Sequence, residues 1–126
     1  MVIGVGIDVV DIERFRTSLA RTPSMRERLF TQVELDYAAP KADPVPSLAA
    51  RFAAREAVMK AMGLGLGAFG FHEVWVEVDT ATGEPSLRVD GAAERLATAR
   101  GITSWHLSLA HDGGVATAMV VAASSS

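Results

Sequence analysis

The chain has 126 residues, of which 49% are hydrophobic and 21% charged, and this balance predicts one compact domain over residues 1–126 with a substantial core. The formal net charge of −3 argues against bulk nucleic-acid binding, and the absence of cysteine excludes a disulfide framework and thiolate chemistry. No apolar run approaches the roughly 20 residues of a membrane-spanning helix, and the N-terminus lacks a basic region followed by a long apolar one, so we expect a cytoplasmic protein.

The first predicted element is a β-strand over residues 2–9, in which apolar side chains alternate with small or acidic ones. One side of this strand carries Ile3, Val5, Ile7 and Val9, and the other carries Gly4, Gly6 and Asp8. From Asp11 the period changes to that of a helix whose apolar face carries Ile12, Phe15 and Leu19. Asp8 therefore either caps this helix or, as a carboxylate beside two glycines, belongs to a site.

Basic residues concentrate in this first helix and just after it. Five of the twelve lysines and arginines lie between residues 14 and 28, against the single acid Glu27, and they are Arg14, Arg16, Arg21, Arg26 and Arg28. A local basic surface on an acidic protein indicates an acidic partner. A solvated helix face without a partner is an equal alternative on charge pattern alone.

Two further helices are predicted in the first half of the chain. Thr31 and Glu34 have the spacing of a capping box, so a short helix starts there and ends before Pro40. A loop then leads to Ser47, the predicted N-cap of the longest helix, which is rich in alanine and ends at Gly63.

The longest helix carries the most informative cluster. Phe52, Glu56 and Lys60 are spaced by four residues and share one helical face. Glu56 and Lys60 are either an ordinary surface pair or residues at the edge of a cleft, because much of the rest of the helix is apolar. In the second case Asp8 and Glu56 suit Mg²⁺, which takes one or two carboxylates, and Lys60 suits a pyrophosphate. The glycines at residues 63–67 either approach a phosphate or form a flexible loop.

The second half of the chain predicts a helix over residues 92–100 and four strands, over residues 74–79, 86–89, 104–110 and 115–122. We expect residues 124–126 to be frayed. Strands and helices do not alternate strictly, so the fold class is α+β, with a largely antiparallel sheet packed with one long and several short helices.

His111, at the turn of the last hairpin, is the histidine with an acidic and glycine-rich context. Its position in the alternation places it with Trp105, Leu107 and Leu109, which favours a hydrogen-bonded histidine at the edge of the core. A ligand role requires that this end of the hairpin faces the helix of Glu56.

Four segments together make the sequence resemble holo-acyl carrier protein synthase, the small homotrimeric class of 4'-phosphopantetheinyl transferases. They are Gly4-Val-Gly-Ile-Asp-Val-Val-Asp11, Arg51-Phe-Ala-Ala-Arg-Glu-Ala-Val-Met-Lys-Ala-Met-Gly63, Gly83-Glu-Pro and Trp105-His-Leu-Ser-Leu-Ala-His-Asp112. They occur in the family's order over nearly the whole chain, and the first two are the most specific. The resemblance implies the 4'-phosphopantetheinyl transferase fold and a Mg²⁺-dependent transfer of phosphopantetheine from coenzyme A to a serine of apo-acyl carrier protein. The second product would be adenosine 3',5'-bisphosphate.

The resemblance also implies roles for single residues. Asp8 and Glu56 bind Mg²⁺ and form the catalytic set with Lys60, which contacts the diphosphate of coenzyme A. Either Glu56 or a water on the metal takes the serine proton. Coenzyme A is further held by Arg51, Gly63, Gly65 and, near its nucleotide end, His111.

The family further implies a partner surface and an assembly. Arg14, Arg21 and Arg28 would dock the acidic recognition helix of acyl carrier protein, in agreement with the charge pattern. Active sites in this family lie between the subunits of a trimer, so the last hairpin would complete a neighbour's site. Whether the carrier protein is of the fatty-acid or the polyketide type stays open.

One departure concerns Arg55, where the family usually has lysine before Glu-Ala. Arginine keeps the charge and changes the donor geometry, so a substrate contact at this position stays open. Two other functions are compatible with the same residues: a Mg²⁺-dependent pyrophosphohydrolase with water as nucleophile, and a non-catalytic module that binds coenzyme A or carrier protein.

Overall fold

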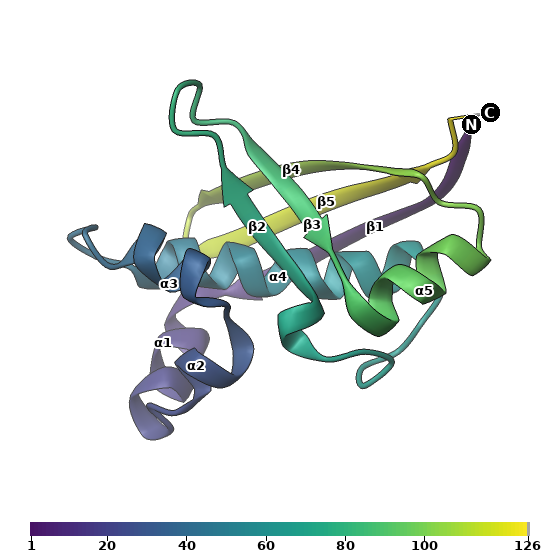
Figure 1. The fold of residues 1–126 in the computed structure, drawn as a ribbon. Helices are drawn as coiled ribbons and strands as arrows, with labels where there is room; N and C mark the ends of the chain where they lie inside the picture. Colours follow the sequence, from purple (N-terminus) through teal and green to yellow (C-terminus); the bar gives the residue numbers. More distant parts are fainter. Residues whose placement is uncertain (126) are drawn as a thin grey trace.

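The computed structural model describes residues 1–125 and contains two antiparallel sheets and one long helix (Figure 1). A three-stranded sheet has the order β1-β5-β4, and a two-stranded sheet consists of β2 and β3. The strands are β1 (Val2–Asp11), β2 (Val74–Val78), β3 (Pro85–Val89), β4 (Ser104–Asp112) and β5 (Val115–Ala123). The helices are α1 (Ile12–Arg21), α2 (Met25–Leu29), α3 (Gln32–Ala38), α4 (Val45–Ala61), α5 (Gly91–Ala99) and the short 3₁₀-helix η1 (Phe71–Glu73). The predicted α+β class is confirmed.

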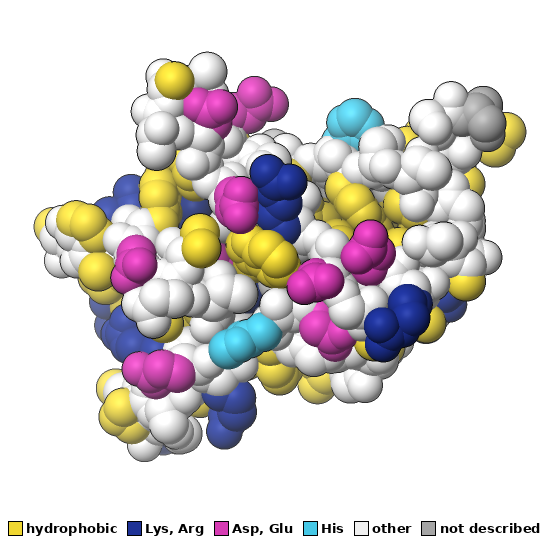
Figure 2. All heavy atoms as spheres, in the orientation of Figure 1, with side chains coloured by type: hydrophobic (Ala, Val, Ile, Leu, Met, Phe, Trp, Pro, Cys, Tyr) yellow, Lys and Arg dark blue, Asp and Glu magenta, His cyan; other side chains and the backbone are white. Residues whose placement is uncertain are grey.

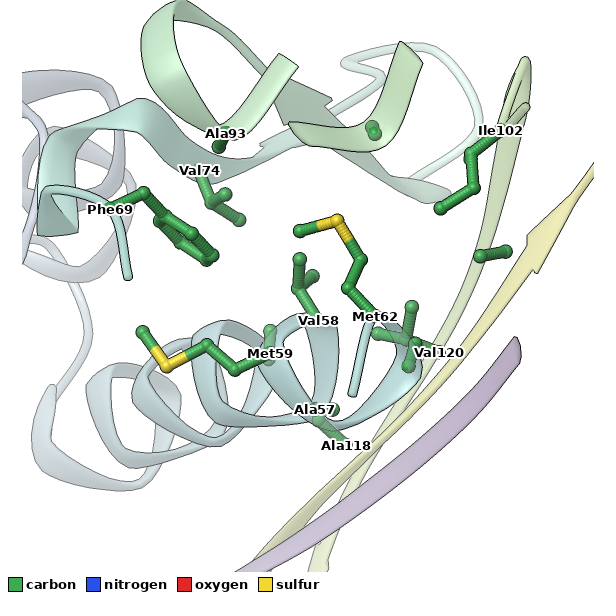
Figure 3. Close-up of a cluster of buried hydrophobic side chains, with 14 of the residues drawn as sticks. Ala57, Val58, Met59, Met62, Phe69, Val74, Ala93, Ile102, Ala118 and Val120 are labelled. Carbon is green, nitrogen blue, oxygen red and sulfur yellow. The ribbon is translucent and has the colours of Figure 1, made fainter. Parts of the chain in front are cut away.

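Helix α4 is the centre of the fold. Its many alanines allow close approach on several sides, and it packs against β1, β5, β2, α1 and α3. Around its C-terminal half, Val58, Met59 and Met62 meet Val74 of β2 and Val120 of β5 in a continuous apolar cluster (Figure 3). A second cluster surrounds the N-terminal half, with Phe15, Phe30 and Leu48 among its members. The two clusters fix α4 along most of its length.

Most predicted elements are confirmed, but α2 and η1 were not predicted, β1 and β4 each end two residues later than expected, and the start of α4 is shifted. This helix begins at Val45, so Ser47 lies inside it and is not its N-cap. Prolines are tolerated in the first turn of a helix, where the backbone N–H groups have no intrahelical partner. The N-cap is Pro44, which makes no side-chain capping bond, and the Asp43 carboxylate one residue earlier accepts a hydrogen bond of 3.2 Å from the Val45 N–H.

The two chain ends lie side by side (Figure 1). The Ser124 N–H donates to the Met1 carbonyl oxygen at 2.8 Å, and the Ser125 N–H donates to Thr103 Oγ1 at 2.8 Å. The expectation of a frayed tail is therefore wrong for Ser124 and Ser125, and Ser126 lies outside the described residues.

The three-stranded sheet is covered on one face only. Helix α4 packs against the face of Gly4 and Gly6, whereas the opposite face exposes the apolar side chains of Ile3, Val5, Ile7, Val9 and Met119. Cross-strand pairing places Ile7 opposite Met119 and Val5 opposite Val121, so these side chains form one continuous apolar patch, which we call the open sheet face. Among the described helices, none is long and apolar enough to cross a membrane.

Candidate active site

The two elements of the candidate site, β1 and α4, meet backbone to backbone. A Cβ atom at Gly6 would lie 1.8 Å from the Ala57 carbonyl oxygen, and one at Gly4 would lie 1.9 Å from the Ala61 carbonyl oxygen. Only glycine permits this approach. Asp8 follows on the same face of β1 and is therefore brought to the side of α4 that carries Glu56 and Lys60.

Lys60 is bound to the strand and not to its neighbour on the helix. Its Nζ atom donates to Asp8 Oδ1 at 3.1 Å and to the Ile7 carbonyl oxygen at 2.9 Å. Among the described ion pairs none joins Glu56 to Lys60, so the ordinary surface pair along the helix is excluded. The capping role of Asp8 is also excluded, because Asp11 caps α1 by accepting a hydrogen bond of 2.8 Å from the Arg14 N–H.

Asp8 and Glu56 line the same cavity, which has a volume of about 360 Å³. Burial raises the pKa of the Glu56 carboxyl, the negative charge of Asp8 raises it further, and Lys60 opposes the rise. Two carboxylates that repel each other at the edge of a cavity form a donor set that a divalent cation would stabilise. The remaining lining residues are Val9, Val10, Asp11, Arg14, Phe15, Ser18, Met25 and Phe52.

This pair of carboxylates fits Mg²⁺ better than a metal that needs an all-protein cage. Residues 1–125 contain no group of three or more histidine, aspartate or glutamate side chains placed to hold a metal. Mg²⁺ is commonly bound by one or two carboxylates and completes its octahedral shell with water and substrate phosphates. Asp8 and Glu56 would hold it, and the cavity leaves room for the other ligands.

His111 and Arg51 lie in a second cavity, with a volume of about 540 Å³, near the N-terminal half of α4. The end of the last hairpin therefore faces α4 at Ala50 and Arg51, away from Glu56. Within one chain the structure does not bring His111 to Asp8 and Glu56. This second cavity also contains Tyr37, Lys41 and Asp43, which sequence reasoning did not single out because they belong to a short helix and a loop without a motif.

Arg51 is almost completely buried at the wall of this second cavity, with 4% of its surface exposed. Its Nη1 atom donates to the Ser47 carbonyl oxygen at 3.2 Å and to Ser47 Oγ at 2.9 Å, while its Nε atom has no hydrogen-bond partner. Burial lowers the pKa of Arg51, and the charge of Glu34 partly opposes this effect. A buried cation with a spare donor can attract an anion.

Gly63 and Gly65 line neither cavity. Gly63 ends α4 with a φ of 69°, as predicted, and donates a hydrogen bond of 3.0 Å to the Lys60 carbonyl oxygen. No other atom lies within 4 Å of a Cβ built at Gly65, so the loop beside Lys60 is open.

The basic residues divide into paired and unpaired ones. Arg16 is neutralised by Glu13 at 3.0 Å and by Asp43 at 2.7 Å, and these bonds raise the pKa of its guanidinium. Among the described ion pairs none involves Arg14, Arg21, Arg26 or Arg28. Figure 2 shows basic side chains at the corner formed by α1 and α2, at its lower left. Arg14 also lines the cavity of Asp8 and Glu56, so the basic surface is continuous with the candidate site.

Arg55 cannot contact a substrate, which resolves the role left open for it. Its side chain and that of Glu34 are both 0% exposed. Arg55 Nη1 and Nη2 donate to the two oxygens of Glu34 at 2.9 and 2.5 Å, and Nε donates to the Phe71 carbonyl oxygen at 2.8 Å. Arg55 therefore joins α4 to α3 and η1 inside the protein.

Comparison with known proteins identifies the family of the chain. The family model described as the 4'-phosphopantetheinyl transferase superfamily matches residues 4–120. The chain is 52% identical to the holo-[acyl-carrier-protein] synthase of Micrococcus luteus, over 97% of this chain and 92% of that protein. It is 53% identical to the holo-[acyl-carrier-protein] synthase of Frankia casuarinae, over 96% of this chain and 97% of that protein.

Solved structures give the same result for the fold. The holo-[acyl-carrier-protein] synthase from Neisseria meningitidis superposes with a TM-score of 0.86 at 31% identity, covering 98% of this chain and 99% of that one. The corresponding protein of Helicobacter pylori, in complex with coenzyme A, superposes with a TM-score of 0.81 at 27% identity, covering 94% and 99%.

Proposed function

The chain belongs to the 4'-phosphopantetheinyl transferase superfamily, and from this premise we propose that Asp8 and Glu56 make it a Mg²⁺-dependent enzyme. It is a holo-[acyl-carrier-protein] synthase, which transfers the phosphopantetheine arm of coenzyme A to a serine of apo-acyl carrier protein. The observation that carries the metal assignment is the shared cavity of the two carboxylates, beside Lys60. Residues 1–126 would act as one catalytic domain.

The reaction exchanges a phosphoanhydride bond of coenzyme A for a phosphoester bond to serine. The serine oxygen attacks the β-phosphorus of coenzyme A, the bond from that phosphorus to the bridging oxygen breaks, and adenosine 3',5'-bisphosphate leaves. The serine proton goes either to Glu56, which lines the cavity that the serine would enter, or to a water at the metal site. When bound, Mg²⁺ supplies charge neutralisation at the phosphate oxygens.

Lys60 supplies the second cationic contact to the diphosphate. Its Nζ atom is held 3.1 Å from Asp8 Oδ1 and is more than half exposed, so phosphate oxygens can reach it. A lysine binds phosphate as a point charge, and preorganised charge of this kind gives most of the rate enhancement in phosphoryl-type transfer. The Gly63 N–H is already bonded to the Lys60 carbonyl oxygen, so the backbone N–H that this loop would offer to the same ligand is that of Gly65, where the surroundings are open.

Docking of the carrier protein is assigned to Arg14, Arg21 and Arg28. All three are exposed and lack an ion pair among the described residues, so they are available to an acidic helix. Arg14 connects this surface with the Asp8 cavity, which gives the incoming serine a short route.

A homotrimer with shared sites accounts for two features. The open sheet face leaves Val5, Ile7, Val9 and their neighbours exposed, as expected of a surface that a second copy covers. Arg51 and His111 lie apart from Asp8 in one chain, so a single coenzyme A would reach both groups where the second cavity of one subunit meets the first cavity of another. The proposal places this reaction in fatty acid biosynthesis and in the cytoplasm, where coenzyme A is available.

Two experiments test these assignments. Glu56→Gln should bind Mn²⁺ at least about tenfold more weakly than wild type in calorimetry and should lose turnover with an unchanged circular dichroism spectrum. Co-expressed Glu56→Gln and His111→Ala subunits, each inactive alone, should regain part of the activity if sites are shared. Release of adenosine 3',5'-bisphosphate without carrier protein would instead indicate a hydrolase.

A further inference from the structure

The aromatic ring of Tyr37 contacts two cations at the wall of the second cavity. The Lys41 Nζ atom lies 4.7 Å from the ring centroid and the guanidinium carbon of Arg51 lies 4.5 Å from it. These distances are within the range of cation–π attraction. The three side chains come from α3, from the loop after it and from α4, so the ring joins three separate parts of the chain.

Tyr37 contributes little to the hydrophobic core. It belongs to neither apolar cluster, and 39% of its surface is exposed. Its neighbour Arg51, in contrast, is buried with its Nε atom unpaired, and the negative face of an aromatic ring compensates part of this cost. The ring contacts of Tyr37 are therefore mainly those with Lys41 and Arg51.

The cavity that these groups line has the charge expected for a phosphate site. Lys41, Arg51 and His111 face a volume of about 540 Å³. Asp43 is the acid on the lining, and its carboxylate is already engaged by Arg16 at 2.7 Å. The excess positive charge is therefore available to a ligand.

We propose that Tyr37 is a positioning residue that holds Lys41 and Arg51 in place for the phosphate groups of the coenzyme A nucleotide. This role rests on the proposed function, which places the nucleotide in this cavity. A free lysine side chain has many rotamers, and ordering it at binding lowers affinity. The ring orders Lys41 in advance and fixes the guanidinium plane of Arg51.

The test uses adenosine 3',5'-bisphosphate as the probe, because it binds without turnover. In calorimetry Tyr37→Leu should raise the dissociation constant about tenfold, whereas Tyr37→Phe, which keeps the ring, should stay within about twofold of wild type. In the transfer assay Tyr37→Leu should raise the KM for coenzyme A and leave kcat and the KM for carrier protein unchanged. A merely structural role would not produce this division. Val33→Ala, an exposed change one turn earlier on α3, is the matched control.

A double-mutant cycle shows whether the ring acts through the cations. If it does, adding Lys41→Met to Tyr37→Leu should weaken binding by less than the product of the two single effects. If the loss of affinity in the double variant equals the product of the two single losses, the proposal is overturned. The proposal is also overturned if Tyr37→Phe loses as much affinity as Tyr37→Leu. If Lys41→Met binds adenosine 3',5'-bisphosphate more weakly and Tyr37→Leu binds it as wild type does, the role of Tyr37 alone is overturned. An unchanged Lys41→Met would overturn the nucleotide assignment of the cavity together with the role of Tyr37.

Discussion

Replacing Arg55 by methionine should destabilise the protein severely without touching the active site. The change removes the partner of Glu34, which is 0% exposed, and leaves that carboxylate buried with three remaining hydrogen bonds, from Val76 N at 3.1 Å, Thr31 N at 3.0 Å and Thr31 Oγ1 at 3.2 Å. Breaking a buried pair in this way costs about 3–5 kcal/mol, because one charge stays in a medium that solvates it poorly. A domain of this size has about 5–15 kcal/mol in total. We therefore expect Arg55→Met to lose a large part of its stability.

The assay is urea unfolding followed by the fluorescence of Trp75 and Trp105, at one fixed protein concentration because self-association adds to apparent stability. Arg88→Met is the matched control, since it removes an arginine from an exposed pair with Glu77 at 3.1 Å. Such surface pairs contribute about 0–1 kcal/mol. The control should unfold at nearly the same urea concentration as wild type.

A second variant tests the cause of the loss. Adding Glu34→Gln to Arg55→Met removes the buried charge and keeps an acceptor for Val76 N. The double variant should be more stable than the single one by about 1 kcal/mol or more. A loss below about 1 kcal/mol in Arg55→Met, or no recovery in the double variant, would refute the reasoning.

Three further predictions concern the strand contact, the partner surface and the carboxylate pair. Gly6→Ala places a Cβ atom 1.8 Å from the Ala57 carbonyl oxygen, so it should lower both kcat and the free energy of unfolding, the latter by about 1–3 kcal/mol in urea titrations. Arg21→Glu combined with Arg28→Glu should raise the KM for acyl carrier protein about tenfold, weaken the salt dependence of that KM and leave the KM for coenzyme A unchanged. An unchanged KM for the carrier protein would show that neither residue belongs to the docking surface. The pKa of Glu56 is raised in the folded protein, so metal-free wild type should lose stability as the pH rises from the pKa of the unfolded state through that of the folded state. Above this pH window Glu56→Gln should melt at a higher temperature than wild type. Below the window the two proteins should melt at similar temperatures. Equal melting temperatures throughout would contradict the raised pKa of Glu56, which burial and the charge of Asp8 produce together.

Elements with a strong local code were predictable from the sequence. The capping box of Thr31 and Glu34 marks the start of α3, and Gly63 marks the end of α4, because both signals act within a few residues. The alternation of β1 was also clear, but not which face is buried. Apolar faces usually pack inward, yet here the glycine face of β1 meets α4 and the apolar face stays open.

The sequence pattern did not predict which side chains pair when the residues are far apart in the chain. Lys60 has Glu56 as its helical neighbour, but it pairs with Asp8, 52 residues away, because β1 and α4 approach closely at the glycines. Glu34 has an evident local role as a capping residue, and its pairing with Arg55 depends on tertiary packing. The second cavity is lined by α3, the loop after it, α4, the β2–β3 hairpin and β4, so no local motif predicts Tyr37 or Lys41.

The most direct measurement is the intact mass of apo-acyl carrier protein after incubation with the enzyme, coenzyme A and Mg²⁺, in parallel with a chelator and with Glu56→Gln. The shared cavity of Asp8 and Glu56 predicts a gain of one phosphopantetheine arm with wild type and Mg²⁺, and no gain in the other two samples. The same gain in chelator, or with the folded Glu56→Gln variant, would contradict a metal-dependent transfer at these two carboxylates.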